Sequence, residues 1–337
     1  MNIIVPMAGM GKRMRPHTLT VPKPLIQLAG KSIVQRLVED IVAVCDEPIE
    51  EIGFIIGHFG EAVEQELLSI AQGLNAKGRI YYQEEALGTA HAILCAEASL
   101  QGKTIVAFAD TLFKADFKIS DEQDGVLWVK QIDDPSAFGV VELNAAGQIV
   151  DFVEKPETFV SDLAMIGVYY FKDGENLKAE LQYLIDNKVI KSGEYQLPDA
   201  LRNMTNKGLR FVPGKVGEWL DCGNKDATVH SNQRVLEHIG HSVESSFEDF
   251  KNVEIVPPCY IAEGVVLKNC KIGPHVSLGR ACEIEDAVIS NSILAEEVKV
   301  TNAQLSNSML GSHSTFEGRG TDLASDVSIS AYSSVKL

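Results

Sequence analysis

Short apolar runs alternate with longer amphipathic segments over the first third of the chain. Ile3 to Val5 is an apolar run that is too short for a helix and is bounded by Pro6, which predicts a buried strand. Further apolar runs, and segments with apolar residues at helical spacing, follow it. They predict strands at 52–56, 79–83 and 104–109, and helices at 32–45, 60–72 and 89–99. This alternation with short connections predicts an α/β fold on a doubly wound, mostly parallel, Rossmann-like sheet.

The alternation breaks after residue 125. Two apolar segments, 138–143 and 148–153, flank the turn-forming residues 144–147 (NAAG), which predicts an antiparallel hairpin. The other elements expected here are strands at 125–131, 165–171 and 209–213, and helices at 174–188, 195–206 and 225–238. We therefore expect the first domain to occupy residues 1–240.

From about residue 253 the pattern becomes a repeat. Single apolar residues recur every five or six positions from Ile255 to Phe316, with small or polar residues between them. No helical period fits, whereas hexapeptide spacing is typical of a parallel β-helix with about three hexads in each triangular coil. We expect a second domain at 241–337, with three to four coils over 255–316 and a cap or loose tail at 320–337. Packing, capping or oligomerisation explains such a domain more simply than a second active site.

The balance of charge narrows the possible partners. The chain has 47 acidic and 30 basic residues among 337, and a net charge of −17, which argues against nucleic acid or an anionic membrane as partner. No apolar run approaches the roughly 18 residues that span a bilayer, and the first residues enter a strand without the pattern of a signal peptide. The six cysteines lack Cys-x-x-Cys spacing, so we expect no zinc site and a reduced, cytoplasmic protein. A homo-oligomer is expected, with its size left open.

The loop after the first strand carries the clearest candidate chemistry. Gly9 and Gly11 let the backbone approach a ligand, and successive N–H groups can cradle an anion. Residues 1–38 contain six Lys or Arg and no Asp or Glu, whereas an even spread of the 47 acidic residues would place about five there. The loop matches neither a Walker A loop nor a dinucleotide fingerprint. It is either a polyphosphate loop or an ordinary strand-to-helix loop with solvated basic side chains.

Two further polar residues follow predicted strands. Gln83 and Asp110 stand at the ends of the strands at 79–83 and 104–109. In open α/β sheets, ligands bind beyond the carboxyl ends of the strands, so both residues and the glycine loop are expected at one edge. A carboxylate at such a strand end suits a hard divalent cation. Asp110, and Asp221 later in the chain, could equally cap a helix or a turn.

Several segments together resemble the sugar-1-phosphate nucleotidylyltransferase family. Residues 8–16 (AGMGKRMRP), 18–20 (TLT) and 22–25 (PKPL) are similar to the opening of that family, in which the pattern is roughly Gly-x-Gly-Thr-Arg-Leu, Pro, Thr and Pro-Lys-x-Leu. Lys12 departs from it, because Thr is usual there. The similarity spans residues 1–240 through motifs in the same order. Several subfamilies append a left-handed β-helix, which the repeat after residue 253 resembles.

The resemblance implies roles for the basic loop and the carboxylates. Lys23 would hold the reacting phosphate and Arg13 the departing pyrophosphate, while Gly9 and Gly11 would contact substrate. Asp110 and Asp221 would bind Mg²⁺, which bridges phosphates in such a transfer. The roles of Lys12 and Arg15 stay open between phosphate contact and solvation.

The resemblance also assigns the base and the sugar. The segment from Gln83 to Gly88 resembles the base-reading stretch, in which the Gln contacts the pyrimidine edge and the Gly leaves room for the ring. An amide offers a donor and an acceptor, which matches uracil or thymine, and guanylyltransferases more often carry an acidic residue there. Residues 154–156 (EKP) imply that Glu154 binds sugar hydroxyls and Lys155 the sugar phosphate, with Gly139 beside the sugar. A surface amide and a solvated ion pair are the alternatives. Weaker candidates, for which a structural role fits equally well, are Glu194 and Trp219.

These features together predict an enzyme. It would transfer a nucleotidyl group from an NTP, with UTP or dTTP favoured, to a sugar 1-phosphate, with glucose 1-phosphate favoured, and release pyrophosphate. Two alternatives stay open. One is a mannose-1-phosphate guanylyltransferase, and the other is a non-catalytic regulatory subunit of the same fold.

Overall fold

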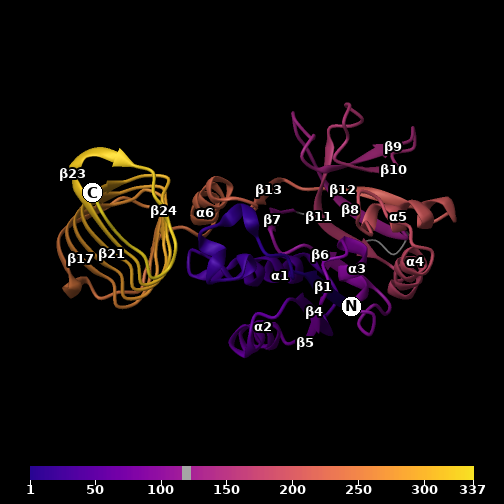
Figure 1. Cartoon of the computed structure of the whole chain (residues 1–337), viewed down its shortest axis with the longest axis horizontal. Coiled ribbons are helices and arrows are strands. Elements are labelled where there is room, and N and C mark those ends of the chain that lie inside the picture. The colour runs from indigo at the N-terminus through magenta and orange to yellow at the C-terminus, as the bar shows by residue number, and fades with distance from the viewer. Residues whose placement is uncertain (116–122) are drawn as a thin grey trace. The chain divides into compact units, whose positions relative to one another are not determined.

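The chain packs into two compact units. The computed structural model describes residues 1–115 and 123–337 (Figure 1). The first unit consists of Met1–Gly9 and Gln35–Trp219, and the second of Met10–Val34 and Leu220–Leu337. The second unit therefore joins the basic loop near the N-terminus to the C-terminal part of the chain. The predicted domain boundary at residue 240 stays a prediction.

A nine-stranded mixed sheet forms the centre of the first unit. Its strand order is β5-β4-β1-β6-β11-β8-β12-β10-β9. The strands are β1 (Asn2–Pro6), β4 (Glu51–Ile56), β5 (Lys77–Tyr82), β6 (Thr104–Ala107), β8 (Gly125–Gln131), β9 (Gly139–Leu143), β10 (Ile149–Glu154), β11 (Leu163–Phe171) and β12 (Phe211–Lys215). The predicted hairpin is β9 and β10, which pair antiparallel.

The prediction of a mostly parallel sheet is correct for only part of it. Strands β5, β4, β1 and β6 are parallel, and so are β8 and β12. Strand β11 runs antiparallel to β6, β8 and β9. The physical reason is where β11 begins: Leu163, its first residue, pairs with Gln131 at the end of β8, so β11 starts at the edge where β8 ends and must run back across the sheet. The α/β class is correct, and the sheet is mixed.

Helices complete the first unit. They are α1 (Ile33–Val44), α2 (Glu61–Gly73), α3 (Thr89–Leu94), α4 (Gly174–Asp186) and α5 (Leu197–Asn206). Apolar side chains of α3, α4 and α5 share one buried cluster with residues of β1, β6, β8 and β11. The prediction placed the end of α3 at residue 99 and missed β7 (Thr111–Lys114), which follows β6 after a turn. Asp110 lies in that turn. No described helix is long and apolar enough to cross a membrane.

The second unit is mainly a stack of coils. Consecutive strands alternate between two parallel six-stranded sheets (Figure 1). One sheet has β14 (Ser242–Val243), β16 (Cys259–Ile261), β18 (Val276–Leu278), β20 (Ser292–Leu294), β22 (Met309–Leu310) and β24 (Ser328–Ile329). The other has β15 (Phe250–Ile255), β17 (Val266–Ile272), β19 (Glu283–Ile289), β21 (Lys299–Leu305), β23 (Thr315–Ser325) and β25 (Ser334–Lys336). The apolar residues of the repeat point into one buried cluster.

The coils extend further than the sequence predicted. Of the two alternatives for 320–337, the loose tail is wrong, because β24, β25 and the end of β23 lie there, whereas the cap stays a prediction. Most coils advance by 16 or 17 residues, as from Lys271 to Val288. Between β21 and β23 the advance grows, so that Leu305 pairs with Ser325. This longer coil interrupts the spacing on which the prediction depended.

Left-handed residues shape the corners of the coils. Residues with positive φ recur every five or six positions, among them Asn269, His275, Ala281 and Asp286. Asn and Asp tolerate this conformation better than most residues. The same corner in successive coils forms a ladder, in which Nδ2 of Asn252 donates to Oδ1 of Asn269 at 3.1 Å and Nδ2 of Asn269 to Oδ1 of Asp286 at 2.9 Å. Sequence spacing and backbone conformation therefore coincide at these positions.

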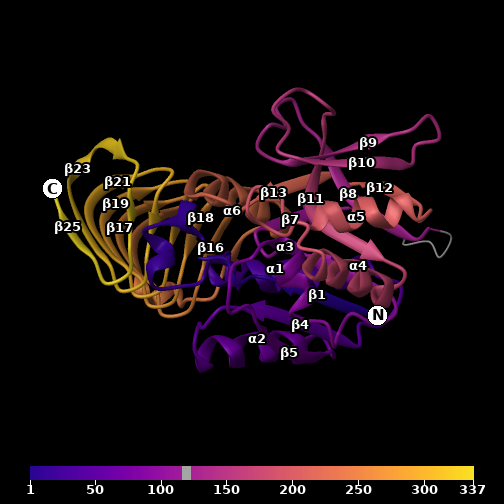
Figure 2. The ribbon, with the colours of Figure 1, turned by 45° about the vertical axis from the view of Figure 1, so that its right-hand side comes forward.

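The basic loop packs on the coils within the second unit. Figure 2 shows the indigo segment beside them. It contains η1 (Lys12–Met14), η2 (His17–Leu19), η3 (Lys23–Leu25), β2 (Gln27–Leu28) and β3 (Lys31–Ser32), and the unit also contains α6 (Lys225–Ile239) and η4 (Phe247–Asp249). His17 Nε2 lies 3.0 Å from Ser328 Oγ, and Ser330 Oγ donates to the carbonyl oxygen of Pro16 at 3.2 Å. Met14 is fully buried, and Thr228 Oγ1 of α6 lies 3.5 Å from its sulfur.

Candidate active site

Polar residues gather at the carboxyl edge of the sheet in the first unit. Gln83 follows β5 directly, and Gly9 and Asp110 each come three residues after β1 and β6. Strands β5, β4, β1 and β6 are consecutive in the sheet and all run in the same direction. The carboxyl ends of β5, β1 and β6 therefore lie at one edge. The structure thus brings the three predicted segments to the same side of the sheet.

The hairpin brings Gly139 and Glu154 to this region. The two residues are register partners, and a Cβ on Gly139 would lie 2.7 Å from Oε2 of Glu154. Val140 pairs with Ala164, which itself pairs with Lys130 near the end of β8. Because β8 runs in the same direction as β6, this register places the start of β9 toward the carboxyl edge.

Tyr169 connects the two carboxylates electrostatically. Its side chain is buried on β11 and packs edge-on against Phe108, with ring centroids 6.2 Å apart. Burial raises the pKa of the Tyr169 phenol, and the negative charges of Glu154 and Asp110 raise it further. Both carboxylates therefore lie within electrostatic range of one phenol, which joins the predicted metal ligand to the predicted sugar ligand.

Glu154 lies in a partly desolvated and charged environment. Burial raises the pKa of its carboxyl group, Lys155 opposes this shift, and Glu194 adds to it. Nζ of Lys155 is 3.9 Å from Oε1 of Glu154, and Lys155 itself has a φ of 45°. Glu194, the weaker sequence candidate, is thus an electrostatic neighbour of Glu154.

The segment from Gln83 to Gly88 is tied to the turn that carries Glu194. The amide of Tyr195 donates to the carbonyl oxygen of Leu87 at 2.8 Å, and the amide of Ala90 to the carbonyl oxygen of Tyr195 at 3.0 Å. Gly88 has a φ of +112°, and a Cβ there would lie 2.4 Å from the Tyr195 carbonyl oxygen. Only glycine fits this position, for a reason that involves no ligand.

Trp219 lies between the Asp110 turn and the start of β9. Its Nε1 donates to Oγ1 of Thr111 at 2.7 Å, and its ring meets Phe138 edge-on at 4.8 Å. The first unit therefore brings together Gln83, Gly88, Asp110, Gly139, Glu154, Lys155, Glu194 and Trp219.

The second unit contains the remaining candidates. Gly11 adopts a left-handed conformation with a φ of 56°, and Thr18 Oγ1 donates to its carbonyl oxygen at 2.9 Å. A Cβ on Gly11 would lie 3.1 Å from Cβ of Lys23. The loop therefore fixes Lys23 beside Gly11, whereas Lys12 and Arg15 are exposed.

Arg13 and Asp221 meet at Gly223. A Cβ on Gly223 would lie 3.1 Å from Nη2 of Arg13 and 3.0 Å from Oδ1 of Asp221. The amide of Gly223 donates to that Oδ1 at 3.0 Å, and Oγ of Ser231 donates to the Asp221 carbonyl oxygen at 2.7 Å. The Arg13 guanidinium and the Asp221 carboxylate therefore lie near each other within the second unit, although the two residues are far apart in the sequence.

The carboxylates fit a hard divalent cation. Among residues 1–115 and 123–337, no group of three or more His, Cys, Asp and Glu side chains is arranged to hold a metal ion. Mg²⁺ is commonly bound by only one or two carboxylates together with substrate phosphates and water. Asp110 lies in the first unit and Asp221 in the second, and both stay predicted ligands of such an ion.

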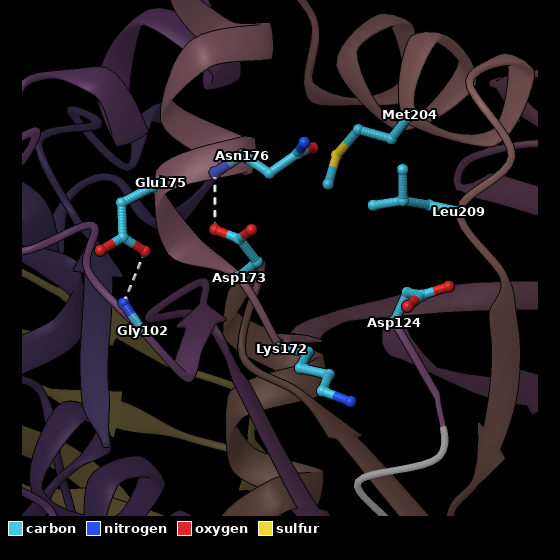
Figure 3. A pocket seen from close by; sticks show the side chains of 8 residues that line it. All are labelled: Gly102, Asp124, Lys172, Asp173, Glu175, Asn176, Met204 and Leu209. Carbon is cyan, nitrogen blue, oxygen red and sulfur yellow. Dashed lines mark hydrogen bonds between the residues drawn. The ribbon is translucent and has the colours of Figure 1, made fainter.

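A cavity of about 640 Å³ lies elsewhere in the first unit (Figure 3). It is lined by Gly102, Asp124, Lys172, Asp173, Glu175, Asn176, Met204 and Leu209. These residues lie where β6, β8 and β12 begin, which is the edge opposite the predicted site. Two of its carboxylates accept backbone hydrogen bonds, Asp173 from Asn176 at 2.9 Å and Glu175 from Gly102 at 2.8 Å. They stabilise the start of α4.

Sequence reasoning missed two residues of the site. In the sequence, Tyr169 is one more apolar position of a predicted buried strand. Its proximity to the carboxylates of Glu154 and Asp110 arises only in the folded sheet. His91 lies in α3 with Nδ1 at 3.2 Å from Nε2 of Gln83. Its spacing of eight residues from Gln83 offered a faint signal, because both flank the Gly88 turn.

In open α/β sheets, ligands bind beyond the carboxyl ends of the strands, which is where the polar residues of the first unit gather. A family model described as nucleotidyl transferase matches residues 2–238. The chain belongs to this nucleotidyl transferase family, and the sequence resemblance is confirmed.

Relatives cover the chain to different extents. The bifunctional protein GlmU of Methanococcus maripaludis is 29% identical over 271 residues, which are 80% of this chain and 62% of the relative. The chain thus spans less than two thirds of that relative's length. A glucose-1-phosphate thymidylyltransferase of Streptomyces antibioticus is 28% identical over 338 residues and 92% of both chains.

Solved structures support the fold. A nucleoside-diphosphate-sugar pyrophosphorylase of Vibrio cholerae superposes with a TM-score of 0.60 at 21% identity, covering 68% of this chain and 99% of that one. A UDP-glucose pyrophosphorylase in complex with UDP-glucose gives 0.59 at 23% identity, covering 70% and 98%. At these identities the likeness concerns the fold alone.

Proposed function

We propose that the protein transfers a nucleotidyl group from an NTP to a sugar 1-phosphate, which yields an NDP-sugar and pyrophosphate. The observation that carries the proposal is that Asp110 and Glu154 both lie within electrostatic range of Tyr169 at the carboxyl edge. Glu194, which Gly88 contacts, is an electrostatic neighbour of Glu154. Membership of the nucleotidyl transferase family supports it.

The reaction brings two anions together, so positioning and charge neutralisation are its main demands. In the proposed mechanism, a phosphate oxygen of the sugar phosphate attacks the α-phosphorus of the NTP, and pyrophosphate leaves. Lys23 contacts the reacting phosphate, and Arg13 the pyrophosphate. Gly9 and Gly11 let backbone amides approach the phosphates.

The remaining residues hold the sugar, the base and the metal. Glu154 accepts hydrogen bonds from sugar hydroxyls, and Lys155 pairs with the sugar phosphate beside Gly139. Gln83 contacts the base. Asp110 and Asp221 would hold Mg²⁺, which would supply positive charge to neutralise the phosphates.

The proposed substrates are UTP or dTTP and glucose 1-phosphate. The name of the S. antibioticus relative, a glucose-1-phosphate thymidylyltransferase, supports this choice. Because other relatives are named GlmU rather than glucose-1-phosphate thymidylyltransferase, other sugar 1-phosphates stay open as substrates. Hydroxyl recognition depends on the pose of the sugar, so the sugar is the first variable to test.

The test is a substrate panel. Pyrophosphate release is measured with UTP, dTTP, GTP, ATP and CTP, each against a set of sugar 1-phosphates, with excess Mg²⁺. We expect the highest kcat/KM with UTP or dTTP and glucose 1-phosphate. A preference for GTP with mannose 1-phosphate would favour a guanylyltransferase. Turnover with no pair would leave the regulatory subunit as the surviving proposal.

The coil part is proposed to form a left-handed β-helix of hexapeptide type, which the recurrence of left-handed residues at five- or six-residue intervals supports. We further propose a catalytic part at residues 1–240, a coil part at 241–337, and a homo-oligomer. Light scattering of the purified protein would measure its mass, and a monomer at micromolar concentration would refute the last point.

A further inference from the structure

Gln83 holds its amide group in a defined orientation. Nε2 of Gln83 lies 3.3 Å from the carbonyl oxygen of Gly88 and 3.2 Å from Nδ1 of His91. A carbonyl oxygen can only accept a hydrogen bond, so the nitrogen of the amide must face Gly88. The hydrogen bond to the Gly88 carbonyl oxygen thus orients the Gln83 amide, with its nitrogen toward Gly88.

His91 completes this arrangement as a second acceptor. An amide nitrogen carries two hydrogens, and the second one faces Nδ1 of His91, which accepts it only when the imidazole is neutral with its proton on Nε2. Burial lowers the pKa of His91 below the ordinary value of 6.5, with a smaller opposing effect of Glu85. The neutral ring that the geometry requires is therefore the dominant form at neutral pH.

The backbone around this pair is fixed from two sides. Oγ1 of Thr89 accepts from the amide of Leu197 at 3.0 Å, and the carbonyl oxygen of Tyr195 accepts from the amide of Ala90 at 3.0 Å. The start of α3, which carries His91, is thereby attached to the segment before α5. The imidazole is presented to Gln83 by a rigid element rather than by a free loop.

This geometry has a consequence for base recognition. With both N–H groups of Gln83 directed at Gly88 and His91, the amide presents Oε1, an acceptor, to a ligand. Uracil and thymine carry a donor at N3 and guanine carries one at N1, whereas cytosine and adenine present a lone pair at the corresponding ring nitrogen. Two acceptors facing each other leave both without a partner, which weakens binding.

We propose that His91 is a positioning residue that locks the Gln83 amide and so restricts the nucleotide to bases with a ring N–H donor. The proposal rests on the proposed function in one respect, namely that Gln83 contacts the base. It narrows the earlier expectation for Gln83, because the amide offers the base its acceptor rather than both of its ends.

Two substitutions at His91 separate the acceptor from the volume of the side chain. His91→Phe keeps a ring and removes the acceptor. His91→Asn restores an acceptor oxygen near the position of Nδ1. The measured quantity is the ratio of kcat/KM for UTP to that for CTP, with one fixed sugar 1-phosphate.

We expect the wild-type protein to favour UTP over CTP by at least about tenfold, as an unpaired acceptor implies. His91→Phe is expected to reduce this ratio at least fivefold, and His91→Asn to keep it within twofold of the wild-type ratio. An unchanged ratio in His91→Phe would overturn the proposal, as would a wild-type enzyme that uses CTP as well as UTP.

A readout without turnover keeps the two proposals apart. The ¹⁵N resonances of the His91 ring report which nitrogen carries the proton, and assignment uses His91→Phe as the blank. An unprotonated Nδ1 at pH 7.5 that shifts in Gln83→Ala supports the proposal. A proton on Nδ1 overturns it. If no NTP is turned over, the proposed function fails, and calorimetric binding of UTP against CTP then decides the inference, with equal or absent binding refuting it.

Discussion

Nε2 of His17 lies 3.0 Å from Oγ of Ser328, although the two residues are 311 positions apart in the chain. His17 is only 5% exposed, and its burial, assisted by the positive charge of Lys225, lowers its pKa to about 4. A neutral imidazole therefore joins the basic loop to a late coil of the second unit.

This pair predicts a pH dependence of stability. In the unfolded chain His17 takes up a proton near pH 6.5, whereas the folded protein resists protonation down to about pH 4. The free energy of unfolding should therefore be highest above pH 6.5 and fall as the pH decreases toward 4, by up to about 3 kcal/mol. Urea unfolding at several pH values measures it. His17→Gln should remove this part of the slope, and an identical slope in that variant would contradict the assignment.

Gly88→Ala should destabilise the first unit. The new methyl group would meet the Tyr195 carbonyl oxygen at 2.4 Å, in a residue whose φ is +112°. We expect the free energy of unfolding to drop by at least about 2 kcal/mol. Gly60→Ala is the matched control, because Gly60 also has positive φ but meets no atom within 4 Å. Equal losses in the two variants would rule out the contact with Tyr195 as the cause.

Gly9→Ala should separate activity from stability. A Cβ on Gly9 would meet no atom within 4 Å, and its φ is not in the left-handed region, so the free energy of unfolding should change by less than about 0.5 kcal/mol. Turnover should fall at least about tenfold, because the methyl group occupies the space through which a phosphate approaches the backbone. Gly73→Ala, which also meets open space, should leave both quantities unchanged. Full activity in Gly9→Ala would remove Gly9 from the site.

Asp110→Asn should lower kcat at least about a hundredfold without unfolding the protein, because a neutral amide is a poor ligand for Mg²⁺. Thermal unfolding checks the fold, and pyrophosphate release checks the activity. Asp322→Asn removes an exposed carboxylate of the second unit and serves as the control. Wild-type activity in Asp110→Asn would refute its role as a metal ligand.

Local patterns were sufficient for most elements of the first unit. Ile3 to Val5, the hairpin around residues 144–147 and β8 are where hydrophobic spacing and turn residues predicted them. The direction of β11 was not predictable in this way, because it depends on the pairing of Leu163 with Gln131, which places the start of β11 beside the end of β8. Strand pairing is a long-range property that no window of sequence contains.

The candidate site divides in the same manner. Glycines, basic residues and strand-end carboxylates stand out in sequence, because their chemistry differs from that of their neighbours. Tyr169 and His91 do not, since an aromatic residue in a buried strand and a histidine in a short helix have ordinary structural explanations. Their importance arises from neighbours such as Glu154 and Gln83, which only folding brings near.

The second unit draws on residues 10–34 as well as on 220–337. The C-terminal coils therefore cannot be exchanged for those of a relative without affecting residues 10–34, even though the coils occupy a continuous stretch of the gene. Replacing residues 241–337 with those of a relative would exchange Ser328 and Ser330 while His17 and Pro16 stayed behind. Recombination at residue 240 would thus produce mismatched partners at the loop that carries Arg13, unless both ends of the gene were inherited together.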